Sequence, residues 1–197
     1  MLILLLAVCA APEIDLVPGK FGKALDASRT PLAFESDARY RQPPITVECW
    51  AKLASKRAFN ILVAHDDKAS ADHWELYTYA GSGRLALYLP GYSPGEIVSK
   101  SPVCDNNWHH VAFTFDGKIA CLYVDGKQVH TQAVTRKKGG KLVRGPLGVG
   151  LAVEGSQRIG CDGLIDDVRI SRVVRPIALP TAAATVDADT LGIWSFD

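Results

Sequence analysis

The sequence has no excess of charge of either sign. Its 197 residues include 22 Lys and Arg against 21 Asp and Glu, which gives a net charge of +1. Binding to nucleic acid or to an anionic membrane usually relies on a basic surface that attracts phosphates over a distance. The balanced charge therefore argues against nucleic acid as a partner and favours an uncharged or locally matched one.

Metal-binding and helical patterns are also missing. The chain has no CxxC pair and no His–Cys cluster, so a zinc site is not expected. No stretch after the first residues places apolar side chains at helical spacing, and no apolar run is long enough to form a transmembrane segment. A hydrophobic share of 48% still allows an ordinary core without metal or disulfide support.

The first residues, MLILLLAVCAA, form a short apolar run that ends in small residues, as a secretory leader does. We predict a signal peptide or leader at residues 1–11, a single domain at residues 12–197, and a secreted, cell-surface or periplasmic protein. The basic residues that normally precede such a run are absent, so a truncated start is the alternative. Cys9 ends a lipoprotein-like tetrapeptide, LAVC, and lipidation there is a further alternative.

The four cysteines after the leader are Cys49, Cys104, Cys121 and Cys161. An exported chain meets an oxidising compartment, and four cysteines allow three pairings. Each lies in an apolar, strand-like context in a domain large enough to fold without cross-links. Buried free thiols are therefore the preferred interpretation over disulfides.

Short runs rich in Val, Ile, Tyr, Phe, Trp and Thr alternate with Gly, Pro, Asn and Asp along the chain, which predicts an all-β protein. The predicted strands are residues 23–26, 45–53, 60–65, 73–80, 84–88, 109–115, 119–124, 128–133, 147–151, 164–171 and 190–197. Residues 174–189 contain Pro176 and Pro180 and are expected to cross irregularly. The basic, glycine-rich residues 136–141 predict an exposed loop, with anion binding as the alternative.

Two Asp-Gly pairs within residues 108–127 predict two successive hairpins, because glycine accepts the positive φ of tight turns. The predicted cross-strand pairs are Phe115 with Ala120, Phe113 with Leu122 and Val111 with Val124. These pairs form one continuous apolar face. The neighbours His109 and His110 point to opposite faces of a strand, so we expect structural histidines that do not share a ligand.

The motifs in this region also resemble a known family. WHHVA at residues 108–112, YVDGK at 123–127 and GLIDDVRI at 163–170 follow in the order and spacing of the concanavalin A-like lectin/glucanase superfamily, and specifically of laminin G-like domains. The resemblance covers residues 20–172. It implies an antiparallel two-sheet jelly-roll sandwich that binds sugars, proteins or proteoglycans.

One motif found in enzymes of this fold is missing from the sequence. Glycan hydrolases of this fold carry Glu-x-Asp-x-x-Glu on one strand, where one acid is the nucleophile and another protonates the leaving group. The sequence has no such spacing: Glu13 and Asp15 lack the third acid, and Glu48, Glu75, Glu96 and Glu154 are isolated. No catalytic residue is therefore predicted, and the protein is not expected to be an enzyme.

Calcium is the one cofactor that the resemblance implies, since a structural ion often joins the terminal strands of this family. Asp166 matches the acidic position of the family's Gly-x-Ile-Asp motif, and Asp26 lies on the predicted neighbouring strand. Carboxylate oxygens are ligands that calcium prefers. The alternative is that Asp166 only accepts hydrogen bonds from turn amides.

Aromatic and acidic residues of the middle third are the candidate ligand site. Aromatic faces stack on sugar rings while a few polar groups bind the hydroxyls. The candidates are Asp66 and Asp67 in a polar loop, Trp74, Tyr77 and Tyr88 on adjacent strands, and Tyr92 in a Pro-Gly-rich loop. Packing in the core is the alternative for each aromatic residue.

The sequence therefore predicts a noncatalytic binding or adhesion module that recognises carbohydrate or a glycosylated surface. Its expected partners are carbohydrate, an extracellular protein or glycoprotein, and other domains of a larger parent protein. The main alternative is a structural accessory domain that packs against the rest of a secreted enzyme. A glycoside hydrolase is a more distant one.

Overall fold

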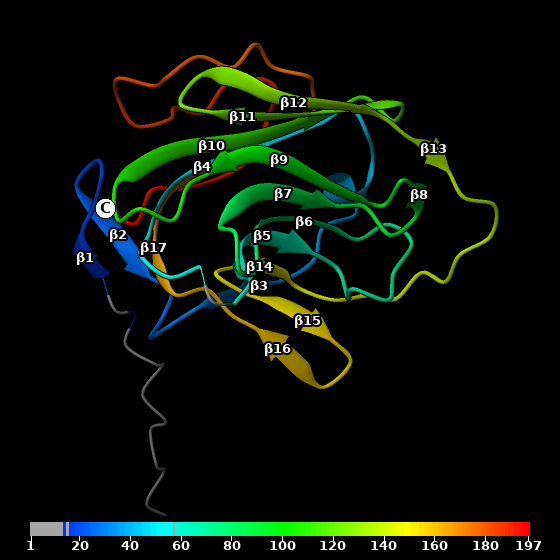
Figure 1. Ribbon diagram of the computed structural model, residues 1–197, viewed down its shortest axis with the longest axis horizontal. Helices are drawn as coiled ribbons and strands as arrows, with labels where there is room; N and C mark the ends of the chain where they lie inside the picture. Colours follow the sequence, from blue (N-terminus) through cyan, green and yellow to red (C-terminus); the bar gives the residue numbers. More distant parts are fainter. Residues whose placement is uncertain (1–13, 15, 57) are drawn as a thin grey trace, which may run out of the picture.

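The computed structural model describes residues 14, 16–56 and 58–197, and most of them belong to two antiparallel sheets packed face to face (Figure 1). In spatial order the larger sheet consists of β1 (Leu16–Pro18), β2 (Lys23–Asp26), β17 (Gly163–Ser171), β4 (Ile45–Leu53), β10 (Trp108–Phe115), β11 (Ile119–Val124) and β12 (Lys127–Ala133). A further strand, β18 (Thr190–Trp194), pairs with β17. The predicted leader and Cys9 lie outside the described residues.

The smaller sheet consists, in spatial order, of β3 (Leu32–Phe34), β14 (Leu147–Val149), β5 (Asn60–His65), β6 (Trp74–Tyr79), β7 (Arg84–Tyr88) and β9 (Glu96–Pro102). Two short pairs lie outside both sheets: β8 (Tyr92–Ser93) with β13 (Thr135–Arg136), and β15 (Ala152–Glu154) with β16 (Gln157–Ile159). One 3-10 turn, η1 (Ala38–Arg41), precedes β4. None of the described residues form a helix of the length and hydrophobicity needed to cross a bilayer.

One hydrophobic core fills the space between the sheets. Alternate residues of β4 and β10, such as Val47, Cys49 and Phe113, meet inward side chains of the smaller sheet, such as Leu76 and Leu87. This alternation follows from the period of two along a strand, which sends one face inward and the other outward. The predicted antiparallel sandwich is confirmed.

The predicted β10–β11 hairpin is confirmed in its register: Phe115 pairs with Ala120, Phe113 with Leu122 and Val111 with Val124. The second turn has positive φ at both Asp125 (50°) and Gly126 (76°), as a tight turn of the predicted kind requires. The two histidines of β10 are structural, as expected. His110 Nε2 lies 3.1 Å from buried Glu48, whereas His109 contacts Asp125 on the other side.

The chain contains strands that the sequence did not predict, of which β9 is the longest. Only two of its seven side chains are fully buried, Ile97 and Ser99, so it lacks the apolar run of a central strand. Within the basic tract, Arg136 pairs with Tyr92 as part of β13, and residues 137–141 are exposed as predicted. Residues 174–189 cross the outer face of the larger sheet, over β11 and β12 in Figure 1, and Ala184 N donates to Asp167.

All four cysteines in the described part of the chain are free. Cys49 and Cys161 are buried, and Cys104 and Cys121 are half-buried. Burial raises the pKa of the Cys49 and Cys161 thiols, which keeps them protonated and unreactive. The preference for free thiols over disulfides is confirmed, although only two of the four are fully buried.

Candidate functional site

The outer face of the smaller sheet carries a second apolar cluster, separate from the core. Along β6, Trp74 and Leu76 point into the core, whereas Tyr77 points to the opposite face. There Tyr77 packs with Ile61 and with Ala152 of the β15–β16 hairpin. The hairpin therefore covers one part of this face and leaves the rest open.

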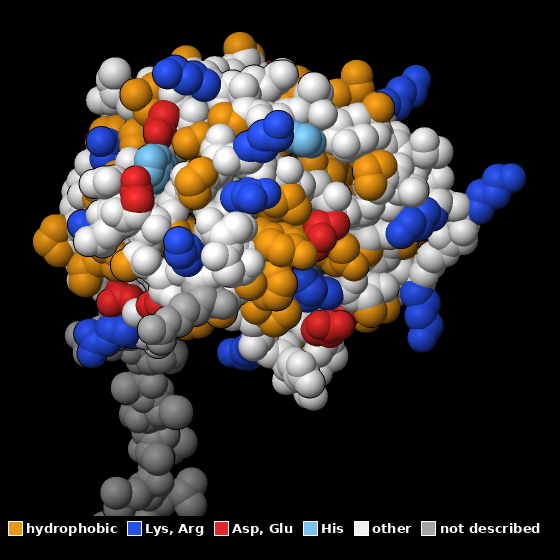
Figure 2. Space-filling view, in the orientation of Figure 1, with side chains coloured by type: hydrophobic (Ala, Val, Ile, Leu, Met, Phe, Trp, Pro, Cys, Tyr) orange, Lys and Arg blue, Asp and Glu red, His pale blue; other side chains and the backbone are white. Residues whose placement is uncertain are grey.

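A hollow of about 320 Å³ lies beside the hairpin, and we call it the tyrosine hollow. Its apolar walls are formed by Phe59, Ile61, Tyr77, Tyr88 and Ile159. The volume is at the lower end of the range of about 300–1,000 Å³ found for small-molecule sites. Figure 2 shows hydrophobic side chains gathered over β5, β6 and β7 near the hairpin, with acidic and basic side chains among them.

Phe59 makes the outer wall of the hollow and is the most accessible aromatic residue there. Its side chain is 41% exposed, and its ring centre lies 5.9 Å from that of Tyr77. Tyr88, from β7, is half-buried. Flat apolar faces that remain partly open to solvent are the groups on which a sugar ring can stack.

The polar groups of the hollow are Lys68, Glu75, Glu96 and Glu154. Lys68 Nζ lies 2.7 Å from Glu75 Oε2 and 4.9 Å from the centre of the Tyr88 ring. The Tyr77 hydroxyl donates to Glu96 Oε1 at 3.1 Å. Glutamates that are isolated in the sequence thus meet at one site, because β6, β9 and β15 carry them to the same face.

The electrostatics of the hollow are set by burial and by these carboxylates. Burial acts to raise the pKa of Glu75, but His73 and Lys68 outweigh it and hold that pKa below its usual value. Burial, followed by the charges of Glu75, Glu154 and Glu96, raises the pKa of Tyr88. Glu75 is therefore ionised and the Tyr88 hydroxyl is neutral at physiological pH.

Asp67 positions the hairpin that borders the hollow. Its Oδ2 accepts from Gly155 N at 2.7 Å, and its Oδ1 accepts from Ala69 N at 2.8 Å. Lys68 N also donates to the carbonyl of Val153. Asp67, a predicted ligand residue, thus acts on the site through the backbone that presents Glu154.

Asp66 was also predicted to face a ligand, and the structure corrects this. Its carboxylate is buried and accepts from Arg41 Nε at 2.6 Å and Nη2 at 3.0 Å. Gly145 N donates to the same group. A buried bidentate ion pair of this kind fixes the loop and leaves no carboxylate oxygen for a sugar.

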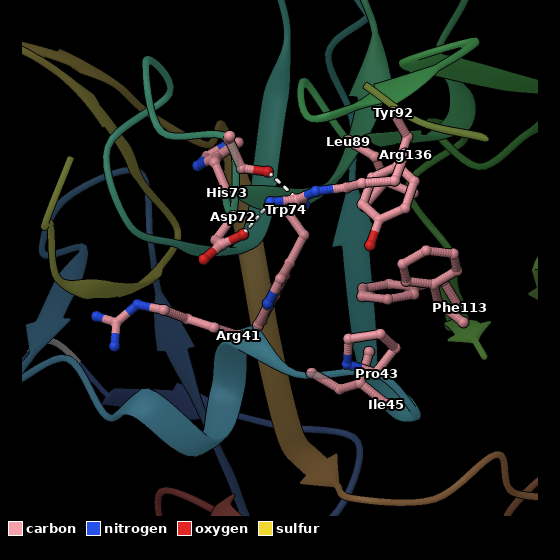
Figure 3. A pocket seen from close by; sticks show the side chains of 12 residues that line it. Arg41, Pro43, Ile45, Asp72, His73, Trp74, Leu89, Tyr92, Phe113 and Arg136 are labelled. Carbon is pink, nitrogen blue, oxygen red and sulfur yellow. Dashed lines mark hydrogen bonds and ion pairs between the residues drawn. The ribbon is translucent and has the colours of Figure 1, made fainter. Parts of the chain in front are cut away.

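Trp74 and Tyr92 were predicted as stacking residues and lie in the core instead (Figure 3). Trp74 is 3% exposed, donates its indole N–H to the carbonyl of Tyr40, and packs edge-on against Phe113. Tyr92 is 9% exposed and packs against Phe115 under the guanidinium of Arg136. The cavity that Trp74 and Tyr92 line measures about 20 Å³, which is room for one water molecule.

Of the predicted ligand residues, only Tyr77 and Tyr88 line the hollow, and sequence reasoning missed the others that do. The sequence contained one signal that could have identified Glu75. Glu75 and Tyr77 are two residues apart, so they share a strand face opposite Trp74. No comparable signal links Phe59, Glu96 or Glu154, which come from separate elements.

The two candidate calcium ligands lie on adjacent strands. Asp26 pairs in register with Leu164, and its Oδ1 accepts from the Ser28 hydroxyl. Asp166 Oδ2 accepts from the amides of Lys20 and Phe21, as the alternative interpretation expected. The described residues contain no group of three His, Cys, Asp or Glu suited to a metal ion, so a calcium site here would need backbone or water oxygens as further ligands.

Asp166 alone keeps a feature of a metal ligand. Its Oδ1 is buried and has no hydrogen-bond partner. Burial raises the pKa of Asp166 to about 6, although the amide donors oppose the shift. Calcium at Asp26 and Asp166 stays a prediction.

Comparison with known proteins agrees with the observed fold. Residues 27–176 match a laminin G family model described as the concanavalin A-like lectin/glucanases superfamily. The chain belongs to this superfamily. Mouse neurexin-2 is 29% identical over 134 residues, which is 68% of this chain but 7% of neurexin-2.

Solved structures share the fold of this superfamily member at low sequence identity. Domain 4 of AbnA, an extracellular arabinanase from Geobacillus stearothermophilus, was solved with arabinotriose and is 17% identical, with a TM-score of 0.54 over 84% of this chain and 79% of that one. The CBM40 domain of a Ruminococcus gnavus sialidase, solved with sialyllactose, is 15% identical, with a TM-score of 0.55 over 74% and 93%. These likenesses concern the fold.

Proposed function

We propose that this domain is an extracellular, noncatalytic carbohydrate-binding module that holds a sugar in the tyrosine hollow. The observation that carries the proposal is the arrangement of Phe59, Tyr77 and Tyr88 beside Glu96 and Glu154 in one hollow on an exposed sheet face. Sugar rings present apolar faces and hydroxyl groups, and the hollow offers a partner for each. The fold shared with AbnA domain 4 and CBM40 supports the same class of ligand.

Substitution of Tyr88 tests the site. Tyr88→Ala removes one stacking face, so retention on a glycan array should fall about fivefold if stacking contributes about 1 kcal/mol. Tyr123→Ala is the matched control, because Tyr123 is also half-buried but lies on β11 of the other sheet. Both variants should be compared with the wild-type domain on glycoprotein glycans and on plant and microbial polysaccharides.

The controls separate this proposal from its rivals. Equal retention by Tyr88→Ala and by the wild type would place the site elsewhere. Binding that appears only when the domain is joined to a parent protein would favour a structural accessory role. Loss of binding in both tyrosine variants would indicate a general loss of structure, which melting curves would reveal.

A glycoside hydrolase is the second candidate, because three carboxylates meet in the hollow. Glycosidases need one acid whose pKa is raised so that it can protonate the leaving oxygen. Glu75 has the opposite shift, which makes it a poor proton donor. Reducing sugar released by the wild type and abolished in Glu96→Gln would establish the enzyme and contradict the noncatalytic proposal.

A further inference from the structure

The charges around the tyrosine hollow are unequal. Among the described residues that line it are three glutamates, Glu75, Glu96 and Glu154, and one basic residue, Lys68. Lys68 is paired with Glu75 at 2.7 Å, so it compensates the one glutamate that is buried. Glu96 and Glu154 are exposed, and they leave the open side of the hollow with two negative charges.

We propose that the hollow selects a sugar that carries a protonated amine, of the glucosamine type, and disfavours sugars that carry a carboxylate. This inference rests on the function proposed above and narrows its ligand class. An ammonium group would neutralise charge at Glu96 and Glu154, whereas a carboxylate would add a third negative charge beside them.

The structure already contains the contact that such an amine would make. Lys68 Nζ is an ammonium held between a carboxylate, Glu75, and an aromatic face, Tyr88. Attraction of a cation to an aromatic face adds to its attraction to a carboxylate. Glu96 beside Tyr77 repeats this pairing of an acid and a tyrosine, but without a cation from the lining residues.

The three carboxylates act on the ring where the sugar is expected to stack. All three line the hollow together with Tyr88, and their charges, after burial, raise the pKa of its hydroxyl. The three carboxylates come from three different strands, β6, β9 and β15. A ligand amine anywhere in the hollow would therefore lie in a negative potential.

Each exposed carboxylate should contribute a modest factor, because solvent screens it. Exposed ion pairs correspond to about a 1.5- to 5-fold change in affinity. If each of the two glutamates contributes about 1.7- to 3-fold, within this range, they predict a preference of about threefold to tenfold for an amine over its acetylated form. Added salt should reduce this preference.

Calorimetry with oligosaccharides of one length and different charge tests the proposal. Fully deacetylated glucosamine oligomers, their N-acetylated counterparts and sialyllactose are titrated into the intact domain at mildly acidic pH, where the sugar amine is protonated. The wild type should bind the amine form about threefold to tenfold more tightly than the acetylated form, and sialyllactose least tightly. The double variant E96Q/E154Q should bind the amine and acetylated forms equally.

Glu35→Gln is the matched control, because Glu35 is an exposed glutamate that does not line the hollow. It should keep the wild-type preference. Equal affinity of the wild type for both oligomers, or a preference for sialyllactose, would overturn the charge proposal. The proposed function would survive either result if Tyr88→Ala still weakened binding.

Two other outcomes also decide the question. If a lysine-rich peptide binds with the same dependence on Glu96 and Glu154 while glucosamine oligomers do not, the ligand is not a sugar and the proposal is overturned. If no oligosaccharide binds and none is retained on the glycan array, both this inference and the proposed function fail.

Discussion

Trp74 and Tyr77 lie three residues apart on β6, and the direction of each side chain decides its role. Trp74 points between the sheets and is part of the core, whereas Tyr77 points outward and lines the tyrosine hollow. A mutation at Trp74 would therefore act on stability, whereas one at Tyr77, which is also buried, would act on both stability and the site. The side chain of Tyr92, which was predicted to contact a ligand, also points into the core.

His65 gives a pH dependence that can be measured. It is fully buried against Trp74, and burial, with a smaller effect of Arg41, lowers its pKa from 6.5 to about 4 despite nearby Asp66. The unfolded state then binds a proton that the folded state does not. The free energy of unfolding is therefore unaffected by His65 above pH 6.5. It decreases as the pH falls towards 4, by about 3 kcal/mol in all.

Urea unfolding between pH 7 and about 4 checks this prediction. His65→Gln should flatten the decline in unfolding free energy over this range, even if the variant is less stable throughout. His130→Gln, on the half-buried middle of β12, is the control and should keep the wild-type slope. A decline equally steep in His65→Gln would assign the effect to other groups.

At the scale of elements, the β15–β16 hairpin connects the fold to the site. It belongs to neither large sheet and is held by backbone contacts with the loop after β5 and by packing of Ala152 and Ile159 on the outer face of the smaller sheet. Through these contacts it brings Glu154 and Ile159 to the hollow. Small elements held by few contacts are the parts of a fold that open most easily.

Asp67→Ala should release this hairpin. The substitution removes the acceptors of Gly155 N and Ala69 N, which should lower the unfolding free energy by about 1–3 kcal/mol and speed hydrogen exchange at Gly155. Glycan affinity should also fall, because Glu154 loses its fixed position.

Asp116→Ala removes a similar pair of amide contacts, to Lys118 N and Ile119 N, in the β10–β11 turn. It should lower stability without changing glycan affinity. If both variants lose affinity equally, the hairpin has no special role at the site.

At the scale of the whole molecule, β17 joins parts of the chain that are far apart in sequence. It pairs with β2, β4 and β18, and the Asp197 carboxylate accepts from Lys23 N. Asp166 on β17 accepts from the amides of Lys20 and Phe21 in the turn before β2. β2 and the last described strand, β18, are thus both held by the same central strand.

Calcium is predicted to strengthen this junction through the free oxygen of Asp166. A ligand that binds only the native state raises its stability by mass action, so millimolar calcium should raise the melting temperature of chelated protein. Asp166→Asn should abolish the rise, because it removes the charge of the carboxylate that carries the unpaired oxygen. Identical melting curves with and without calcium would contradict the prediction.

The sequence by itself determined the sandwich and much of its register. Alternation of apolar residues and the Asp-Gly turns are local signals, and they predicted the pairing of Phe113 with Leu122 in β10 and β11. Family motifs added the antiparallel two-sheet arrangement. These features depend on residues close together in the chain, so one sequence was sufficient.

The tertiary structure alone decided which side chains form the site. Glu75, Glu96 and Glu154 are isolated in the sequence, and strand pairing together with the Asp67 contacts brings them to one hollow. The sequence placed Trp74 and Tyr92 in the site because composition shows which residues are aromatic. Composition does not show which face of a sheet an aromatic side chain occupies. Only the packing of the two sheets decides whether that face is buried in the core or can contact a ligand.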